Sequence, residues 1–529
     1  MRKRVLLLAF ATAASVGLGA QEFSKADWVG GFPDGCTSIT VGKRATADGS
    51  VITSHTDDSH RTSSAIEITP PLDHAKGSTV TMYRRVNDDS KAMPTYAYLK
   101  TGEIPQIPKT FGYINSAYPC MNEYQLGVGE STFGGRPELR TDQGLVDCQD
   151  LIRLMMERCK TAREALDLAE FVLAEYGWID AGECLTIADK KEVWHLEIVG
   201  PGQGRKGAVW AAQRVPDDHL SVNANASTIK EINLGDPNHF RASDNIYDVA
   251  RENGWWNENE PFRFCYAYAP ESRTSLAARR REWRVFDLVA PSLKLDPNAE
   301  NYPFSVKPDQ PVTLDQLITI FKDYYEGTDF NFIKDITVTD DEGKTVISPM
   351  ANPFMPYDMN KVFKINGGWG WLGERTIARW YTMYATIIQC RDWLPDEVGG
   401  VTWMALDNVA TSVYIPIFAG VTDLPQSYKV DGRVTGYSTE SAWWAFNRLS
   451  TLAAQRWGDM RKDVDAEWLP LQKEIFRRTR EIEEAALLAA SVRDRKQLLT
   501  QFTVTWGTEV VKRAWKLGDL LWTRYDEKF

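Results

Sequence analysis

A lone cysteine at the start of a β-rich segment constrains this chain more than any other feature of its sequence. The stretches 35–42 (GCTSITVG) and 51–58 (VITSHTDD) are rich in β-branched residues, which favour strands. Between them, Asp48-Gly49 is a typical hairpin turn signal. The sequence therefore predicts a hairpin with Cys36 at one end and Asp57-Asp58 returning beside it.

Cys36 carries two reactive groups if the chain is cut between Gly35 and Cys36. An α-amine titrates near ~8, so a useful fraction is neutral around pH 7. Such an amine lies a few bonds from the thiol and can take its proton, with no distant histidine needed. Before the cut the same nitrogen is an amide and cannot act as a base, so cleavage would switch activity on. By spacing alone, an ordinary buried or disulfide-bonded cysteine remains the alternative.

The first residues resemble an export signal. Arg2-Lys3-Arg4 precedes the apolar run Val5 to Leu18, and small residues follow at 19–20. We expect residues 1–20 to be a signal peptide and the protein to be exported, to a bacterial periplasm or the exterior. Residues 21–35, rich in glycine, then read as a short propeptide, with a disordered leader as the alternative. No later stretch is apolar over a length that spans a bilayer, so no membrane anchor is expected.

The composition excludes some partners. The 529 residues include 43% hydrophobic and 25% charged residues, as in soluble globular proteins. The net charge of −11 and the lack of a basic cluster argue against nucleic acid as a partner. The seven cysteines are an odd number, so in an exported chain at least one stays unpaired within the molecule. Cys36 is our candidate.

Periodicity predicts an α+β protein in which helices pack on sheets. Helical spacing covers 147–160, and a capping box at Thr161–Glu164 opens a second helix that ends at Gly177. Short strand patterns follow at 184–189, 193–199 and 208–212, a helix at 314–325, and further strands at 376–389, 401–406 and 412–417. From residue 441 the pattern is helical, so we expect a main domain over 36–440 and a helical C-terminal extension over 441–529.

Four sequence elements carry a resemblance to a known family. They are Cys-Thr-Ser-Ile-x-Val-Gly-Lys-x-Ala-x-x-Asp-Gly-Ser from Cys36, Met-Asn-Glu-x-x-x-Gly-Val-x-Glu-Ser-Thr-Phe from Met121, Val-x-Ala-Asn-x-Ser from Val222 and Arg-x-Trp-Arg-Val from Arg281. Together they resemble the C69 dipeptidases, N-terminal-nucleophile hydrolases with sites similar to those of choloylglycine hydrolases and penicillin V acylases. The similarity runs from Cys36 to about Lys429. It implies a four-layer αββα sandwich and a catalytic role for Cys36.

The resemblance also implies roles for other residues. Asp58 matches the aspartate beside the terminal amine, Asn225 the oxyanion-hole asparagine and Arg281 the arginine beside the nucleophile. An amide donor on a developing alkoxide contributes roughly 3–4 kcal/mol. Two positions depart from the family: Thr132 replaces an asparagine or tyrosine on the oxyanion side, and His55 replaces an arginine, for which a neighbouring arginine can compensate. From the residues alone, Asn225 reads as a loop residue and Arg281 as part of a solvated charged face.

A dipeptidase must also recognise the free ammonium group of its substrate. Asp57 and Glu130 are the carboxylates nearest to the matched positions, and we expect one of them to bind it. Strand alternation places His55 with Asp57 on one face and Asp58 with His60 on the other, which raises a metal site as an alternative. No HExxH or cysteine-rich pattern accompanies these residues, so we expect no metal and no cofactor.

The lead hypothesis is thus a secreted cysteine dipeptidase that acts on dipeptide substrates. One alternative keeps the site but acts on bile-salt or other N-acyl amide conjugates, which requires an apolar acyl pocket. Another is a non-catalytic exported binding protein that uses paired tryptophans at 255–256, 369/371 and 443–444 as a surface. The sequence leaves open whether cleavage is autocatalytic and whether the protein is a homo-oligomer.

Overall fold

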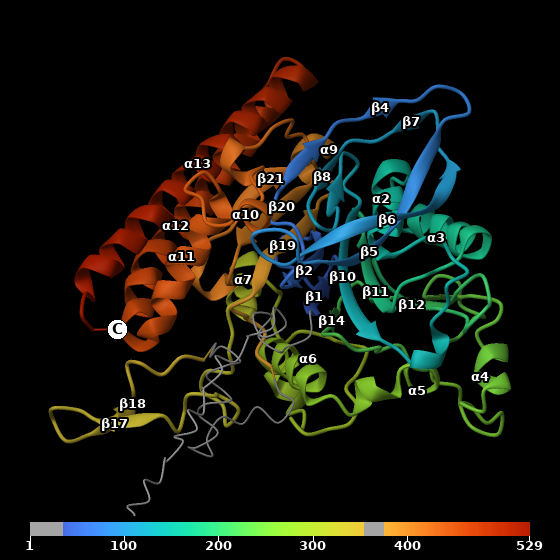
Figure 1. The fold of residues 1–529 in the computed structure, drawn as a ribbon, viewed down its shortest axis with the longest axis horizontal. Helices are drawn as coiled ribbons and strands as arrows, with labels where there is room; N and C mark the ends of the chain where they lie inside the picture. Colours follow the sequence, from blue (N-terminus) through green and yellow to red (C-terminus); the bar gives the residue numbers. More distant parts are fainter. Residues whose placement is uncertain (1–34, 354–374, 529) are drawn as a thin grey trace, which may run out of the picture.

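The computed structural model describes residues 35–353 and 375–528, an α+β fold as the sequence predicts (Figure 1). The predicted signal peptide and most of the predicted propeptide lie outside the described residues, as do Trp369 and Trp371. Two large antiparallel sheets form the centre of the molecule. The predicted division into domains at 36 and 441 stays a prediction.

A seven-stranded sheet carries the N-terminal hairpin. Its order is β16 (Ser305–Val306), β14 (Leu220–Asn223), β1 (Gly35–Val41), β2 (Val51–Asp58), β19 (Thr382–Cys390), β20 (Val401–Leu406) and β21 (Ile415–Phe418). β1 and β2 pair antiparallel with Cys36 opposite Asp57 and Gly35 opposite Asp58. Gly49 has φ +83°, the left-handed conformation that this turn requires. The predicted hairpin is therefore confirmed.

An eight-stranded sheet lies against the first. Its order is β15 (Phe240–Ala242), β13 (Val209–Arg214), β12 (Val193–Val199), β11 (Gly182–Ala188), β10 (Gly127–Gly134), β9 (Met121–Asn122), β8 (Tyr113–Asn115) and β3 (Glu67–Thr69). β10 contacts β1 and β2, so the middle strands of the two sheets face each other. The buried His195 Nε2 and Thr40 Oγ1 lie 2.8 Å apart and join the sheets through a hydrogen bond.

Glycines on β10 set how closely the two sheets approach. A Cβ on Gly129 would lie 2.3 Å from the Ser54 carbonyl oxygen, and one on Gly127 would lie 2.6 Å from Ile388 Cγ2. A real Cβ does not fit at such distances, so glycine at these two positions is what allows the close approach of the sheets.

Helices cover the outer sides of both sheets (Figure 1). α2 (Cys148–Arg158) and α3 (Ala162–Tyr176) pack on the eight-stranded sheet, where predicted. The Thr161 hydroxyl accepts a hydrogen bond from the Glu164 amide at 3.2 Å, a cap that contributes about 1 kcal/mol. On the opposite side, α11 (Ala442–Gln455), α12 (Trp457–Leu487) and α13 (Val492–Arg524) pack on β20 and β21 and on each other.

Shorter elements connect these layers. The remaining helices are α4 (Asp248–Glu252), α5 (Phe264–Tyr268), α6 (Leu276–Val289), α7 (Leu314–Phe321), α9 (Asp396–Gly399) and α10 (Gly432–Thr435), with 3₁₀ turns at Pro137–Leu139, Pro270–Arg273, Pro291–Leu293, Val409–Thr411 and Gln426–Tyr428. The two-stranded pairs are β5 (Thr79–Asp88) with β6 (Thr95–Pro105), β4 (Leu72–Asp73) with β7 (Lys109–Thr110), and β17 (Thr337–Thr339) with β18 (Thr345–Ile347). The predicted helix 314–325 ends at Phe321, and the strand predicted from 376 begins at Thr382.

All seven cysteines lie within the described residues, and each is a buried free thiol. Cys36 thus shares the unpaired state with the other six. Among the described helices, none has both the length and the apolar character needed to cross a membrane.

Candidate active site

The hairpin brings Cys36 into the interface between the two large sheets. Cys36 is 3% exposed. In the described chain Gly35 is still joined to it, so its nitrogen is an amide. That amide donates to Asn225 Oδ1 at 3.1 Å, and the thiol donates to Glu130 Oε1 at 2.8 Å. Both reactive atoms of the predicted nucleophile are therefore held by side chains from other strands and loops.

Asn225 lies at the centre of a network of donors. It follows β14 with φ +57°, a conformation that asparagine tolerates better than most residues. Its Oδ1 also accepts from Arg281 Nη2 at 2.8 Å and from Arg375 Nη1 at 3.3 Å. Its Nδ2 donates one hydrogen to the Thr132 carbonyl at 2.7 Å, and an amide nitrogen has a second hydrogen to give.

Arg281 reaches Cys36 from α6. It is 1% exposed, so the solvated charged face considered for this arginine-rich run is wrong at this position. Its Nη1 donates to the Cys36 carbonyl at 2.7 Å and to Thr37 Oγ1 at 2.9 Å. Burial, and next the positive charge of Arg375, lowers the pKa of Arg281 to about 9, so it stays protonated at pH 7.

Asp58 is fully buried and forms an ion pair with Arg375. Thr382 Oγ1 donates to its other oxygen at 2.6 Å. Arg375 is 6% exposed and contacts both Asp58 and Asn225. It was not identified from the sequence. No motif surrounds it, and only the expectation of a compensating arginine near His55 pointed to such a residue.

His55 is buried, and a nitrogen of its ring lies within 4.8 Å of the Cys36 sulfur and of a Glu130 carboxylate oxygen. Its Nδ1 contacts the Glu130 backbone, and its ring packs against Tyr118 and Tyr384 with centroids 5.4 and 5.6 Å away. His55 is not among the residues that line the cavity beside the Cys36 thiol, and its role in substrate binding stays a prediction.

A cavity of about 250 Å³ opens beside the Cys36 thiol. Its lining comes mainly from β2, β10, β11 and the β5–β6 hairpin, and consists of Gly35, Cys36, Asp57, Ser59, Thr62, Arg85, Tyr96, Tyr118, Glu130, Thr132, Asp180 and Glu183. Asp57, Glu130 and Thr132 line it, and their roles in substrate binding stay predictions. The Thr132 hydroxyl donates to Glu183 Oε1 at 2.8 Å, so it does not face an oxyanion. Glu183 and Arg85 were not identified from the sequence.

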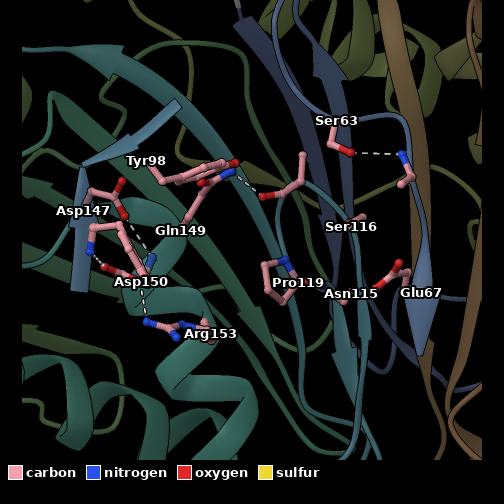
Figure 2. A pocket seen from close by; sticks show the side chains of 13 residues that line it. Ser63, Glu67, Tyr98, Asn115, Ser116, Pro119, Asp147, Gln149, Asp150 and Arg153 are labelled. Atoms are coloured by element: carbon pink, nitrogen blue, oxygen red, sulfur yellow. Dashed lines mark hydrogen bonds and ion pairs between the residues drawn. The ribbon is translucent and has the colours of Figure 1, made fainter. Parts of the chain in front are cut away.

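A second cavity, of about 590 Å³, lies on the other side of Arg85 from the cavity at Cys36 (Figure 2). Figure 2 shows Tyr98, Asp147 and Gln149 on one side of it and Ser63 and Glu67 on the other. Arg85 lies between the two cavities, since it contacts Asp147 at 3.8 Å and Asp180 at 3.2 Å. The larger space is lined by none of the residues that contact Cys36, so the chemistry belongs to the smaller one.

Two compact groups in the described part of the chain offer metal ligands. One is Cys36, His55 and Glu130, and the other is Glu130, Cys148 and Glu183, each with ligand atoms within 4.8 Å of one another. Neither group contains the pairs His55–Asp57 or Asp58–His60 that strand alternation suggested. Burial lowers the pKa of His60 to about 3, and its ring stacks on Tyr381 with centroids 4.3 Å apart.

The comparison with known sequences decides the family. A family model described as Peptidase family C69 matches residues 35–469. The chain belongs to peptidase family C69. It is therefore a peptide-bond hydrolase, and the match begins one residue before Cys36 and includes every residue of the site described above.

Curated relatives of this C69 chain are distant in sequence but similar in extent. A probable dipeptidase of Latilactobacillus sakei is 22% identical over 81% of this chain and 83% of its own length. Dipeptidase A of Lactobacillus helveticus is 21% identical over 79% of this chain and 81% of its own length. A probable dipeptidase B of Lactococcus lactis is 24% identical over 74% of this chain and 76% of its own length.

Proposed function

We propose that this C69 peptidase is an exported cysteine dipeptidase whose nucleophile is Cys36, released by a cut between Gly35 and Cys36. The observation that carries the proposal is the pair of contacts on Cys36: its nitrogen faces Asn225 Oδ1 at 3.1 Å and its sulfur faces Glu130 at 2.8 Å. The dipeptidase names of the relatives support the substrate class. The two facing sheets with helices outside them support a four-layer N-terminal-nucleophile hydrolase fold.

On this proposal, the uncleaved chain is catalytically inactive. Its Cys36 nitrogen is an amide and accepts no proton. Burial, followed by the negative charges of Glu130 and Asp57, raises the pKa of the Cys36 thiol well above its usual value, so the sulfur stays protonated. Cleavage places a basic amine where the amide stands, beside the sulfur.

The reaction then needs only groups already in place. The amine takes the thiol proton while the sulfur attacks the scissile carbonyl, and the second Nδ2 hydrogen of Asn225 faces the developing oxyanion. The ammonium returns the proton to the leaving amino group as the carbon–nitrogen bond breaks. Water then attacks the thioester, again with the amine as base, and releases the first amino acid and the free thiol.

Arg281 and Arg375 act as positioning residues in this scheme. Both donate to Asn225 Oδ1, which fixes the amide with its nitrogen turned toward the Thr132 carbonyl. Arg375 also forms the ion pair with Asp58. Its Nη1 lies close to Gly35, because a Cβ placed on Gly35 would be 2.3 Å from that nitrogen.

The alternatives find less support. A bile-salt amidase needs a large apolar pocket, whereas the cavity at Cys36 has about 250 Å³ and four carboxylates, below the ~300–1,000 Å³ of pockets for drug-sized ligands. A binding protein that uses its tryptophans needs them exposed, whereas Trp443 is 3% exposed and packs in the core.

N-terminal sequencing and intact mass of the exported protein test the proposal. We expect a chain that starts at Cys36 and hydrolyses L-alanyl-L-alanine but not glycocholate, and a Cys36→Ala chain that does not turn over. Full turnover by a chain that still carries residues before Cys36, or by Cys36→Ala, would refute it. Loss of residues 1–20 on secretion tests export separately.

A further inference from the structure

Two buried carboxylates in the Cys36 cavity form no ion pair among the described residues, because the cavity's arginine, Arg85, pairs with Asp147 and Asp180 instead. Glu130 and Glu183 are each 1% exposed, and each has an Oε2 atom without a hydrogen-bond partner among the described residues. Neither forms an ion pair in that part of the chain. A buried charge is costly unless it is paired, so this arrangement calls for a positive partner from outside.

The other two carboxylates of the cavity already have partners. Asp180 accepts from Arg85 at 3.2 Å and from the Cys148 amide at 3.2 Å. Asp57 accepts from Thr62 Oγ1 at 2.7 Å. Among the four carboxylates of the cavity, the buried oxygens without a hydrogen-bond partner in the described residues belong to Glu130 and Glu183.

The strand register aims both groups at the same space. Glu130 and Thr132 are two residues apart on β10, so they share one face of the sheet, and Glu183 on β11 is the direct partner of Thr132. The Thr132 hydroxyl donates to Glu183 Oε1 at 2.8 Å and fixes that carboxylate. Ligand atoms of Glu130 and Glu183 lie within 4.8 Å of each other.

We infer that Glu130 and Glu183 form the subsite that binds the α-ammonium group of the dipeptide, with Glu183 as the determinant of its selectivity. This inference rests on the proposed function. In a dipeptide the ammonium nitrogen is two bonds from the scissile carbonyl carbon, so it must lie close to the attacking sulfur. Glu130 Oε1 is 2.8 Å from that sulfur, within reach of such a nitrogen.

The contact between Glu130 Oε1 and the Cys36 sulfur links substrate binding to the protonation of the thiol. Burial, then Glu130 and Asp180, raises the pKa of the Glu183 carboxyl well above its usual range in the empty site, because both causes disfavour its charged form. An ammonium beside Glu183 favours that charged form. It also offsets the Glu130 charge that raises the pKa of the Cys36 thiol. Substrates that bear the ammonium therefore help to activate the sulfur.

The experiment compares L-alanyl-L-alanine with N-acetyl-L-alanyl-L-alanine on wild type, Glu183→Gln, Glu183→Asp and the control Glu192→Gln. Glu192 is a buried carboxylate whose ion pairs with Arg163 and Arg214 lie outside the cavity. We expect Glu183→Gln to lower kcat/KM for the free dipeptide about 10- to 100-fold, mainly through KM, as for the loss of one hydrogen bond to a charged group. The acetylated substrate should not be slowed, Glu183→Asp should recover part of the loss, and Glu192→Gln should match wild type.

Three results would overturn the inference. One is a Glu183→Gln enzyme, with its N-terminus verified as Cys36, that keeps the wild-type preference for the free dipeptide. Another is a stoichiometric metal in the purified enzyme whose removal abolishes turnover, since Glu130, Cys148 and Glu183 would then be its ligands. The third needs only wild type: equal inhibition by L-alaninamide and N-acetyl-L-alaninamide, where we expect only the free amine to compete. A wild type that does not hydrolyse L-alanyl-L-alanine at all would instead refute the proposed function.

Discussion

The ion pair between Asp58 and Arg375 gives the sharpest test of how this site is held together. Asp58 is fully buried, and the Arg375 side chain is 8% exposed. Arg375→Met keeps an unbranched side chain but leaves the Asp58 carboxylate with hydroxyl donors alone, from Thr382 at 2.6 Å and Thr56 at 3.4 Å. Breaking a buried pair by removing one partner costs about 3–5 kcal/mol, a fifth or more of a typical folding free energy of ~5–15 kcal/mol.

The assay is a double-mutant cycle in urea. Arg375→Met, Asp58→Asn and the double variant are unfolded in a Cys36→Ala background, so that all chains remain uncleaved to the same degree. We expect each single variant to lose about 3–5 kcal/mol and the double variant to lose at least ~1 kcal/mol less than the sum, because it leaves no unpaired charge. In the Cys36 background, Arg375→Met should lower kcat/KM at least tenfold, since Asn225 also loses a donor.

Arg391→Met is the matched control for this cycle. Arg391 pairs with Glu483 at 2.7 Å, and the two side chains are 8% and 14% exposed, but the pair lies outside the Cys36 cavity. It should cost comparable stability and leave the turnover of the folded enzyme unchanged. Additive losses in the cycle, or full turnover by Arg375→Met, would refute the reasoning.

Three further substitutions test the fold. Gly129→Ala should destabilise by about 1–3 kcal/mol in urea unfolding, because its Cβ would lie 2.3 Å from the rigid Ser54 carbonyl; an unchanged midpoint would contradict the sheet contact. Burial lowers the pKa of His195 to about 3, so between pH 6.5 and 3 the unfolded state binds the extra proton and stability falls as pH falls, by up to roughly 5 kcal/mol. His195→Gln should flatten that part of the stability–pH curve, and an equally steep curve would reject the assignment. Trp468→Ala should cost about 3–5 kcal/mol by thermal or urea unfolding, since Trp468 is 1% exposed and its indole donates to the Thr411 carbonyl at 2.9 Å; a loss under 1 kcal/mol would show that the C-terminal helices are not anchored there.

Local patterns in the sequence were enough to predict the hairpin and much of the layering. The strand pattern around Cys36 and the Asp48-Gly49 turn depend on neighbouring residues, and the register Cys36–Asp57 follows from them. The capping box at Thr161 marked the start of α3 for the same reason. The end of the predicted helix 314–325 was wrong, because Tyr325 has φ +66° and cannot continue a helix.

The second half of the site depends on contacts between distant parts of the chain. Arg375 is 317 residues from Asp58, and nothing in its neighbours marks it as a partner of a buried carboxylate. Glu183 carried a weak signal, a charged residue that opens the buried strand pattern from Cys184 to Ala188. Only the pairing of β10 with β11 shows that this carboxylate faces the same space as Glu130.

The charges around Cys36 are divided between two sides, and this division orients a substrate on the proposed function. Arg281 and Arg375 meet at Asn225, whereas Glu130 and Glu183 line the cavity beyond the sulfur. A dipeptide turned the wrong way would bring its ammonium toward the guanidinium groups. Two like charges 4 Å apart repel by ~4 kcal/mol at an effective dielectric constant of 20, and the ion pair of Arg375 with Asp58 offsets part of this repulsion. The reversed pose is therefore the less populated one. The attack geometry is therefore selected by electrostatics, and a substrate whose amine is acylated loses this selection together with its ammonium contact.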